Sequence, residues 1–143
     1  MAGNLEVSPM MTPTQGLLAY MSAFEELDLN GLFAMFDDHL TMRFPYIVDG
    51  YPKELQGRSQ CEGFLSSVAA IFRQVRWVKR DVYSTSDPEL AMAIAESSVI
   101  LSGGGTYTND YVLLLRMREG KIIEYTEYFD PNRAHSVFSA AAG

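Results

Sequence analysis

Two different periods of hydrophobic residues divide the chain into a helical first half and a β-rich second half. Apolar residues recur at a spacing of three and four between Leu17 and Leu27, whereas alternation and β-branched runs dominate after Arg73. The first spacing is typical of an amphipathic helix and the second of half-buried strands. Helices followed by hairpin-connected strands predict an α+β domain, with a curved antiparallel sheet whose one face is covered by the helices.

Three helices and one short strand are predicted in the first half. Thr12, Pro13 and Gln15 form a capping box that begins the first helix, whose buried stripe is Leu17, Tyr20, Met21, Phe24 and Leu27. A second helix is expected at residues 32–37 and a strand at residues 40–44, ended by Pro45. Ser59 and Glu62 indicate a capping box for the third helix. Its predicted stripe is Cys61, Phe64, Leu65, Val68 and Phe72.

Four longer strands are predicted in the second half, separated by turn residues. They span residues 75–84, 90–101, 106–117 and 122–129. We expect a flexible N-terminus over residues 1–12, a single domain over residues 13–139 and a tail over residues 140–143. The loop at residues 45–57 is longer than the usual four to six residues, and loops of that length often border a site.

Composition narrows the classes of partner. The 143 residues carry a net charge of -7, which argues against nucleic acid and anionic membranes, because both require a positive surface. Cys61 is the sole cysteine, so no internal disulfide forms, and the start of the chain has no signal-peptide pattern. These features predict a cytoplasmic protein with no membrane segment. No spacing of His39, His135 and Cys61 indicates a metal site or a nucleophile, and we expect no cofactor.

Glu127 lies among aromatic residues in the last predicted strand, between Tyr125 and Phe129. A carboxylate on the outer face of a sheet has little energetic cost, whereas one pointing into an apolar cavity tends to keep its proton. Both orientations are compatible with the sequence. An inward orientation would make Glu127 a general acid or base.

The turns between the strands allow an estimate of register. A three-residue turn at residues 118–120 and a glycine turn at residues 103–105 would align the last three strands. The expected pairs are Glu96 with Tyr111, Ser98 with Asn109, and Tyr111 with Glu127. Glu96 and Glu127 would then face one cavity on either side of Tyr111, although Glu96 could equally be solvent-exposed. A one-residue change in either loop would move a strand's side chains to the opposite face.

Three segments carry a resemblance to a known superfamily. They are LLAYMSAFEELDLNGLFAMFDDHLTMRFP, YTNDYV and EGKIIEYTEYFDP, within a similarity that spans residues 14–138. They resemble the nuclear-transport-factor-like cone fold, also described as a cystatin-like α+β barrel, which includes ketosteroid isomerase, SnoaL-like polyketide cyclases, limonene epoxide hydrolase and phenazine-biosynthesis proteins. The resemblance implies a cone-shaped pocket between the sheet and the helices, and a homodimer.

The resemblance transfers some functional positions and not others. The phenazine-type proteins and the epoxide hydrolase place a catalytic carboxylate at Glu127, and the hydrolase places a second at Glu96. The hydrolase's intervening arginine falls on Ile94, which cannot hold two carboxylates. The ketosteroid isomerase tyrosine matches Tyr20, but the base and protonated acid of that enzyme fall on Phe44 and Leu113. We therefore do not expect this chain to use the catalytic residues of the epoxide hydrolase or of ketosteroid isomerase in the same way.

These observations predict a cofactor-independent acid–base enzyme acting on a small hydrophobic oxygenated metabolite. The expected reaction is isomerisation, cyclisation, dehydration or epoxide opening, with Glu127, Glu96 and Tyr111 as catalytic residues. The candidate substrate-binding residues are Tyr20, Phe24, Arg43, Phe44, Phe64, Ser98, Asn109, Leu113 and Phe129. Arg43 could instead pair with a nearby aspartate. The alternative function is a non-catalytic protein that binds a hydrophobic ligand or a partner. Apolar residues on the outer sheet face predict a homodimer through that face.

Overall fold

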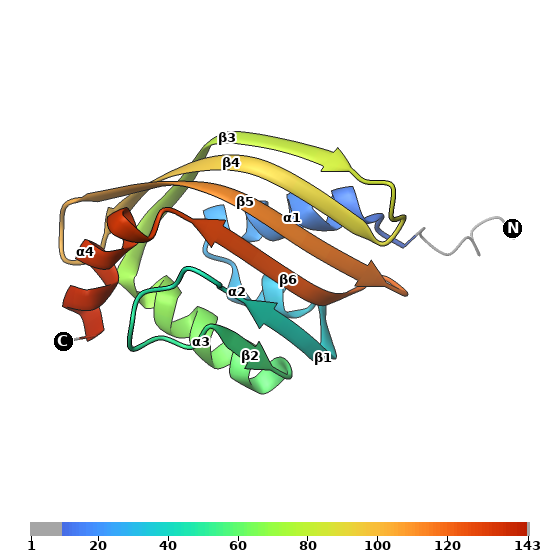
Figure 1. Cartoon of the computed structure of the whole chain (residues 1–143), viewed down its shortest axis with the longest axis horizontal. Helices are drawn as coiled ribbons and strands as arrows, with labels where there is room; N and C mark the ends of the chain where they lie inside the picture. The colour runs from blue at the N-terminus through green and yellow to red at the C-terminus, as the bar shows by residue number, and fades with distance from the viewer. Residues whose placement is uncertain (1–9, 143) are drawn as a thin grey trace, which may run out of the picture.

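The structure is a computed structural model that describes residues 10–142, with side chains described for residues 10–138. The predicted N-terminal segment therefore lies outside the described residues except for residues 10–12, and no side chain of the predicted tail is described. Figure 1 shows one curved sheet that wraps around the helices, and the predicted α+β cone fold is confirmed. No helix in the described part of the chain has the length and apolar character needed to cross a membrane.

Six strands form the sheet, in the order β2-β1-β6-β5-β4-β3. Their bounds are β1 Phe36–Arg43, β2 Glu54–Gln56, β3 Phe72–Ser84, β4 Leu90–Leu101, β5 Thr106–Arg118 and β6 Lys121–Phe129. Strands β3 to β6 are antiparallel neighbours, as hairpin connections require. The β1–β6 pair is parallel, because the chain crosses from β1 to the far edge of the sheet through β2 and helix α3.

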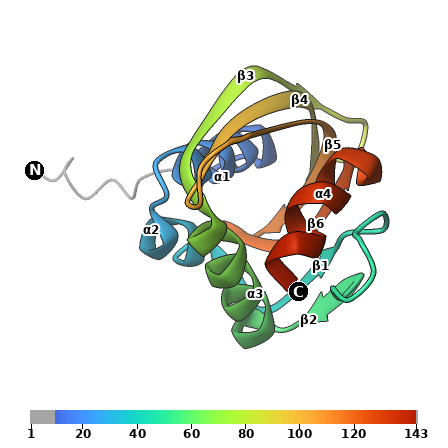
Figure 2. The same ribbon diagram turned by 90° about the vertical axis from the view of Figure 1, so that its left-hand side faces the viewer.

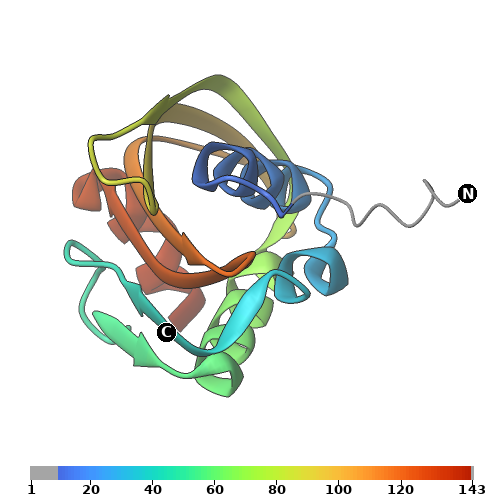
Figure 3. The ribbon, with the colours of Figure 1, turned by 90° about the vertical axis from the view of Figure 1, so that its right-hand side faces the viewer.

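The described residues form four helices, α1 Pro13–Glu25, α2 Leu29–Phe33, α3 Arg58–Ile71 and α4 Pro131–Ala142, of which α1, α3 and α4 pack against strands of the sheet. Figure 3 shows α1 inside the arc of the sheet. Figure 2 shows α3 below that arc and α4 across the opposite end. Helices α1, α3 and α4 thus contact different parts of the sheet, and α1 lies against strands β3, β4 and β5.

Helix α1 follows the predicted cap. The Thr12 hydroxyl accepts a hydrogen bond from the backbone N–H of Gln15, and the Gln15 side chain accepts one from the Thr12 N–H. The stripe residues Leu17, Tyr20 and Met21 are buried against the sheet. The capping box and the first part of the stripe are local features and are confirmed, whereas Leu27 lies beyond the end of α1 with a φ of 54°.

Helix α2 lies earlier than predicted. The carboxylate of Asp28 accepts a hydrogen bond from the Gly31 N–H, so Asp28, which separates α1 from α2, caps the start of α2. The prediction of a helix at residues 32–37 is therefore wrong, and Phe36 already belongs to strand β1. Phe36 is buried in strand β1. An apolar residue would be buried in the predicted helix as well, so its apolar character could not distinguish a helix from a strand.

The start of α3 and the presence of α4 also differ from expectation. Helix α3 follows Gly57, which has a φ of 87°, and it has no side-chain cap, so the Ser59 capping box is not formed. Strand β6 ends at Phe129, as predicted, and the carboxylate of the next residue, Asp130, accepts a hydrogen bond from the Asn132 N–H at the start of α4. With Pro131 at the first helical position, the same residues that ended the strand begin a helix that was not predicted.

The inner face of β4 carries small side chains. Ala91, Ala93, Ala95, Ser97 and Val99 are each 3% exposed or less. Their alternation with outward residues matches the pleat of a half-buried strand. Small residues facing the helices leave space between sheet and helix, and that space lies where α1 crosses the middle of the sheet.

The strand register differs from the prediction in both the β5–β6 pair and the β4–β5 pair. Tyr111 pairs with Phe129, two residues from the predicted partner, because the turn contains two residues and a bulge lies between Arg116 and Met117. A two-residue difference preserves the face, so Tyr111 and Glu127 still point inward. On the other side, Ser97 pairs with Asn109, a difference of one residue. That difference turns Ser97 inward and Glu96 outward.

Candidate active site

Glu127 faces a small cavity inside the cone. The cavity has a volume of about 50 Å³ and lies between helix α1 and strands β3, β4, β5 and β6. Its lining residues are Tyr20, Phe24, Phe72, Val75, Trp77, Ser97, Val99, Tyr111 and Glu127. A single carboxylate therefore shares an enclosed space with three hydroxyl groups and an otherwise apolar wall.

Burial changes the acidity of Glu127. Removal of the carboxylate from water raises the pKa of Glu127 to about 7, and a hydrogen bond from the Tyr125 hydroxyl opposes part of that rise. The bond is 2.7 Å long and ends on Oε1 of Glu127. A carboxyl group with this pKa exchanges a proton readily near neutral pH, which is the property of a general acid or base.

Two buried and stacked tyrosines, Tyr20 and Tyr125, lie beside Glu127. The Tyr125 ring stacks on the Tyr20 ring with centroids 4.3 Å apart, and both residues are at most 2% exposed. Burial and the charge of Glu127 raise the pKa of both hydroxyls well above the usual value. Both tyrosines therefore keep their protons at neutral pH and can act as hydrogen-bond donors.

A second polar group faces Glu127 across the cavity. The Ser97 hydroxyl and the Tyr111 hydroxyl are 2.9 Å apart, and Ser97 is 3% exposed. Burial, the neighbouring Tyr107 and the charge of Glu127 raise the pKa of Tyr111, which keeps this hydroxyl protonated. Strand β5 lies between β4 and β6, with Ser97 opposite Asn109 and Glu127 opposite Leu113, so the backbones of Ser97 and Glu127 are offset by about 10 Å across the sheet and by about 13 Å along it.

Trp77 forms the wall nearest to helix α1. Its indole N–H donates a 2.9 Å hydrogen bond to the Met21 carbonyl, and its backbone N–H donates one of 2.8 Å to Glu25. Its ring lies 5.3 Å from the Tyr111 ring in an edge-to-face arrangement. A bulge between Trp77 and Lys79 interrupts the ladder at this point. Bulges commonly aim a side chain into a site, and this one accompanies the inward turn of the indole.

Four of the residues predicted for the site line the cavity together, namely Tyr20, Phe24, Tyr111 and Glu127. Four others lie in the core around it. Phe44 packs on Phe64 with ring centroids 5.1 Å apart, Leu113 pairs with Glu127 in the sheet, and Phe129 lies 6.4 Å from the Tyr111 ring. They shape the cavity without lining it in this conformation.

Glu96 and Ser98 do not belong to the cavity, contrary to the prediction. Glu96 is exposed on the outer face of the sheet, between Lys79 and Asp110 on the neighbouring strands. Ser98 points to the same outer face. The physical reason is the one-residue register difference, which exchanges the two faces of β4. The expected pair of carboxylates in one cavity is therefore wrong.

Arg43 and Asn109 also have roles other than those predicted. Arg43 donates from Nε to Glu54 at 3.0 Å on the outer face, so it pairs with an acidic residue of β2 and not with a ligand. Asn109 is buried, but its amide N–H groups donate to Tyr107 and to the Asp130 carbonyl. Its oxygen accepts from two backbone N–H groups. All its polar atoms are occupied by the protein.

Five further residues line the cavity and were not predicted, namely Phe72, Val75, Trp77, Ser97 and Val99. Phe72 was assigned to a helix stripe, but it begins strand β3. The run of small residues at alternate positions of β4 was the available signal, because small inward side chains leave room for a cavity. Trp77, the single tryptophan, was a second signal.

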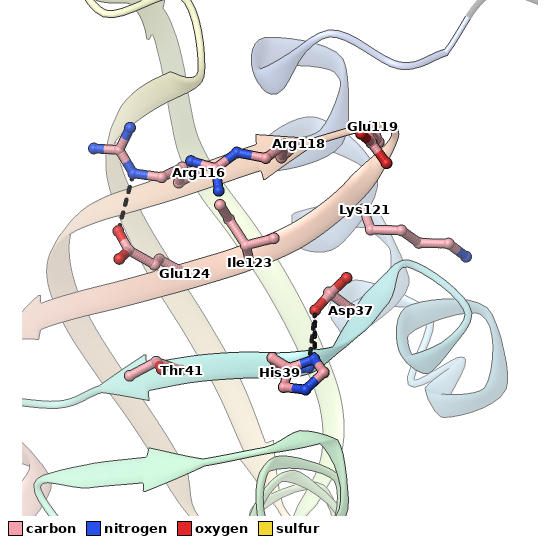
Figure 4. Close-up of a pocket in the computed structure, with 9 residues that line it drawn as sticks. All are labelled: Asp37, His39, Thr41, Arg116, Arg118, Glu119, Lys121, Ile123 and Glu124. Carbon is pink, nitrogen blue, oxygen red and sulfur yellow. Dashed lines mark hydrogen bonds and ion pairs between the residues drawn. The ribbon is translucent and has the colours of Figure 1, made fainter.

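A larger hollow lies on the outer face of strands β1, β5 and β6 (Figure 4). It measures about 630 Å³ and is lined by charged residues. Arg116 pairs there with Asp87 at 2.7 Å and Glu124 at 2.9 Å, and Arg118 pairs with Glu89 at 2.9 Å. Arg116 and Arg118 are already neutralised by carboxylates, whereas the Lys121 ammonium donates to the Ala34 carbonyl at 2.9 Å. Among residues 10–138, no cluster of three or more His, Cys, Asp or Glu side chains could hold a metal ion.

The curved sheet packed around helix α1 is the cone fold of nuclear-transport-factor-like domains. A family model for the SnoaL-like domain matches residues 17–125, and the chain belongs to this family. An uncharacterised PhzA/B-like protein from Pseudomonas aeruginosa is 27% identical over 124 residues, which are 86% of this chain and 87% of that protein.

Solved structures support the same fold. A Bacillus subtilis protein whose name includes isomerase superposes with a TM-score of 0.81 at 20% identity, over 89% of this chain and 92% of that protein. TerC, co-crystallised with polyporic acid, superposes with a TM-score of 0.71 at 21% identity, over 89% of this chain and 98% of that one. At such identities the similarity establishes the fold and leaves the activity to the residues of the site.

Proposed function

We propose that the protein is a cofactor-independent enzyme that moves a proton on a small hydrophobic oxygenated molecule, with Glu127 as the acid or base. The observation that carries the proposal is the enclosed carboxyl of Glu127, hydrogen-bonded to Tyr125 at 2.7 Å, with a pKa of about 7. Near neutral pH both protonation states are populated, so the same group can remove a proton and return it.

The chemistry follows from the position of the polar groups. The Glu127 carboxylate takes a proton from a carbon beside a carbonyl group, and the electron pair of the broken C–H bond moves onto the carbonyl oxygen. The hydroxyls of Tyr20 and Tyr111 remain protonated and can donate to that developing oxyanion. If the enolate is conjugated with a carbon–carbon double bond, return of the proton to the far carbon completes an isomerisation. If a hydroxyl group lies β to the carbonyl, the proton held by Glu127 passes to that hydroxyl, water leaves and a dehydration is complete. The similar Bacillus subtilis structure, whose name includes isomerase, supports this class of reaction.

The cavity of about 50 Å³ is much smaller than the 300–1,000 Å³ typical of ligand sites. A substrate must therefore displace side chains on entry. The aromatic residues Phe24, Phe72 and Trp77 are only partly buried and line the cavity, so they are the groups that would move. A cavity that side chains largely fill also favours a second candidate function, a non-catalytic protein of the same fold that binds a hydrophobic ligand or a partner.

The exchange of carbon-bound hydrogen tests the catalytic proposal without knowledge of the natural substrate. Small ketones such as cyclopentanone are incubated in D₂O, and the loss of α-hydrogen is followed by NMR. We expect wild type to accelerate exchange, with a rate that rises with pH through about 7 as Glu127 ionises. Glu127→Gln should lower the rate by about a hundredfold to ten-thousandfold.

Glu96→Gln is the matched control, because Glu96 is an exposed glutamate on the outer face and its change should leave the rate unaltered. Equal rates in wild type and Glu127→Gln would exclude Glu127 as the proton-transferring group. Binding of the ketones without any exchange in wild type would support the ligand-binding alternative.

A further inference from the structure

Phe24, Phe72 and Trp77 are partly buried and line the cavity, but they differ in how firmly they are held. The indole N–H of Trp77 donates to the Met21 carbonyl at 2.9 Å, and its backbone N–H donates to Oε2 of Glu25 at 2.8 Å. The side chains of Phe24 and Phe72 are hydrocarbon and have no hydrogen-bonding group. Displacement of Trp77 therefore breaks hydrogen bonds, whereas displacement of either phenylalanine ring does not.

The two hydrogen bonds attach Trp77 to the last turn of helix α1. Met21 and Glu25 are four residues apart, so they lie on the same face of the helix. The bond to Met21 holds the indole ring, and the bond to Glu25 holds the main chain of strand β3. Together they restrict both rotation of the ring and movement of the strand, which makes Trp77 a fixed part of the cavity wall.

A bulge in strand β3 explains why an acceptor is required at Trp77. Trp77 and Lys79 pair with consecutive residues of β4, so Val78 is an extra residue on β3. A bulge locally disrupts the ladder of backbone hydrogen bonds. The Trp77 N–H lies at this disruption, where Glu25 accepts its hydrogen bond. Because an N–H shielded from water is unfavourable without an acceptor, Glu25 stabilises the bulge that directs Trp77 into the cavity.

The carboxylate of Glu25 is itself held by Arg80. Arg80 lies three residues after Trp77, and the extra residue of the bulge places both side chains on the inner face of β3. Nη2 of Arg80 donates to Oε1 of Glu25 at 2.6 Å, and Nη1 donates to the Ser22 hydroxyl at 3.3 Å. One carboxylate oxygen of Glu25 is thus fixed by Arg80 while the other holds Trp77.

We propose that Trp77 sets the upper size of ligands in the Glu127 cavity, and that Glu25 is the positioning residue that keeps Trp77 in place. A small ligand enters by displacing Phe24 and Phe72, whereas a larger one also has to displace Trp77. The inference rests on the proposed function in that this cavity receives the substrate. Since the cavity measures about 50 Å³, the substrate class is narrowed to monocyclic oxygenated molecules, and fused-ring molecules are disfavoured.

Two ketones of different size test this limit by binding alone. Indanone is cyclopentanone with a fused benzene ring, so the two probes share the carbonyl group and differ in bulk. The methyl groups of Val75 and Val99 line the cavity, and their NMR signals in selectively labelled protein report its occupancy. We expect wild type to bind cyclopentanone more tightly than indanone, although the larger apolar surface of indanone would by itself favour the opposite order.

Trp77→Ala should raise the ratio of indanone to cyclopentanone affinity by about tenfold or more, the size of effect typical of added bulk in a hydrophobic pocket. Trp77→Phe, a more conservative change, should raise the ratio by a smaller factor. Glu25→Ala should raise it by about two- to tenfold, because one hydrogen bond of Trp77 is removed. Glu25→Gln keeps an acceptor for the Trp77 N–H and should retain most of the wild-type preference. Glu26→Ala, at the exposed neighbouring glutamate, is the control.

The double variant of Trp77→Ala and Glu25→Ala separates a positioning role from a general loss of packing. If Glu25 acts through Trp77, the double variant has the same affinity ratio as Trp77→Ala alone. Additive changes would overturn the role of Glu25. A ratio that stays at the wild-type value in both Trp77→Ala and Trp77→Phe, or no shift at either valine with either ketone, would overturn the size limit.

These outcomes are separable from those of the proposed function, because they depend on binding and not on hydrogen exchange. If Glu127→Gln leaves exchange unaltered but the Trp77 variants admit indanone, the size limit stands and the catalytic assignment fails. If Glu127→Gln abolishes exchange and the Trp77 variants keep the wild-type ratio, the catalytic assignment stands and the size limit fails.

Discussion

The hydroxyl of Tyr125 donates a 2.7 Å hydrogen bond to Oε1 of Glu127, two residues further along strand β6. Residues separated by two positions share a face of a strand, so both side chains project into the cone. The bond favours the charged carboxylate, whereas burial favours the neutral acid. The proton affinity of Glu127 results from the balance of these two effects, which leads to the first prediction.

Tyr125→Phe should raise the pKa of Glu127 from about 7 to about 8, because the variant removes one hydrogen bond to the carboxylate and leaves the carboxyl buried. The titration can be followed by NMR of ¹³C-labelled glutamate carboxyls, with Glu127→Gln to assign the signal. Tyr83→Phe, at an exposed tyrosine, serves as the control and should have no effect. A pKa that stays constant or falls in Tyr125→Phe would contradict the balance described above.

The raised pKa of Glu127 also predicts how stability depends on pH. The native state keeps a proton that the unfolded chain releases near its ordinary pKa of 4.5, so wild type loses stability as pH rises from about 4.5 through about 7. Glu127→Gln has no such loss. Its unfolding free energy in urea should exceed that of wild type by roughly 1–3 kcal/mol at pH 8, and the difference should disappear below pH 4.5. A difference that is independent of pH between 4 and 8 would show that Glu127 is not buried as a neutral acid.

Trp77 is the sole tryptophan and forms part of the cavity wall, so its fluorescence should report ligand entry. Cyclopentanone or cyclopentane in the cavity would exclude water from the indole and change both the intensity and the wavelength of emission. A fluorescence titration should give the same dissociation constant as a titration followed by the NMR signals of the Val75 and Val99 methyl groups, because both valines line the cavity. Shifts of those methyls with constant Trp77 emission would indicate that ligands occupy the cavity without displacing the tryptophan.

The outer sheet face predicts self-association. Val78, Ile94 and Val112 are 49%, 40% and 38% exposed, and Ile94 and Val112 are paired on neighbouring strands. We expect a homodimer in sedimentation velocity, since exposed apolar side chains on adjacent strands favour a partner. Ile94→Lys should shift the dimer toward monomer. Leu18→Lys, at an apolar residue of α1 that is 40% exposed, is the control that should remain dimeric. A wild-type protein that sediments as a monomer would contradict the prediction.

Features set by neighbouring residues were predictable. The capping box at Thr12 and Gln15 depends on residues three positions apart, and the bounds of β4 depend on alternation within one segment. The α+β order follows from the change of hydrophobic period along the chain. Helix α2 was misplaced because Asp28 can either interrupt a helix or cap the next one, and both uses have the same local sequence.

The chemistry inside the cone required long-range information. A bulge between Arg116 and Met117 and a one-residue difference at the glycine turn were enough to retain Glu127 and Tyr111 in the cavity and to place Glu96 outside it. The sequence by itself determined the fold class and marked Glu127 as an unusual strand residue. The tertiary structure decided which side chains meet it, because strand partners are set by turn geometry and packing between distant segments, and a shift of one residue exchanges the two faces of a strand.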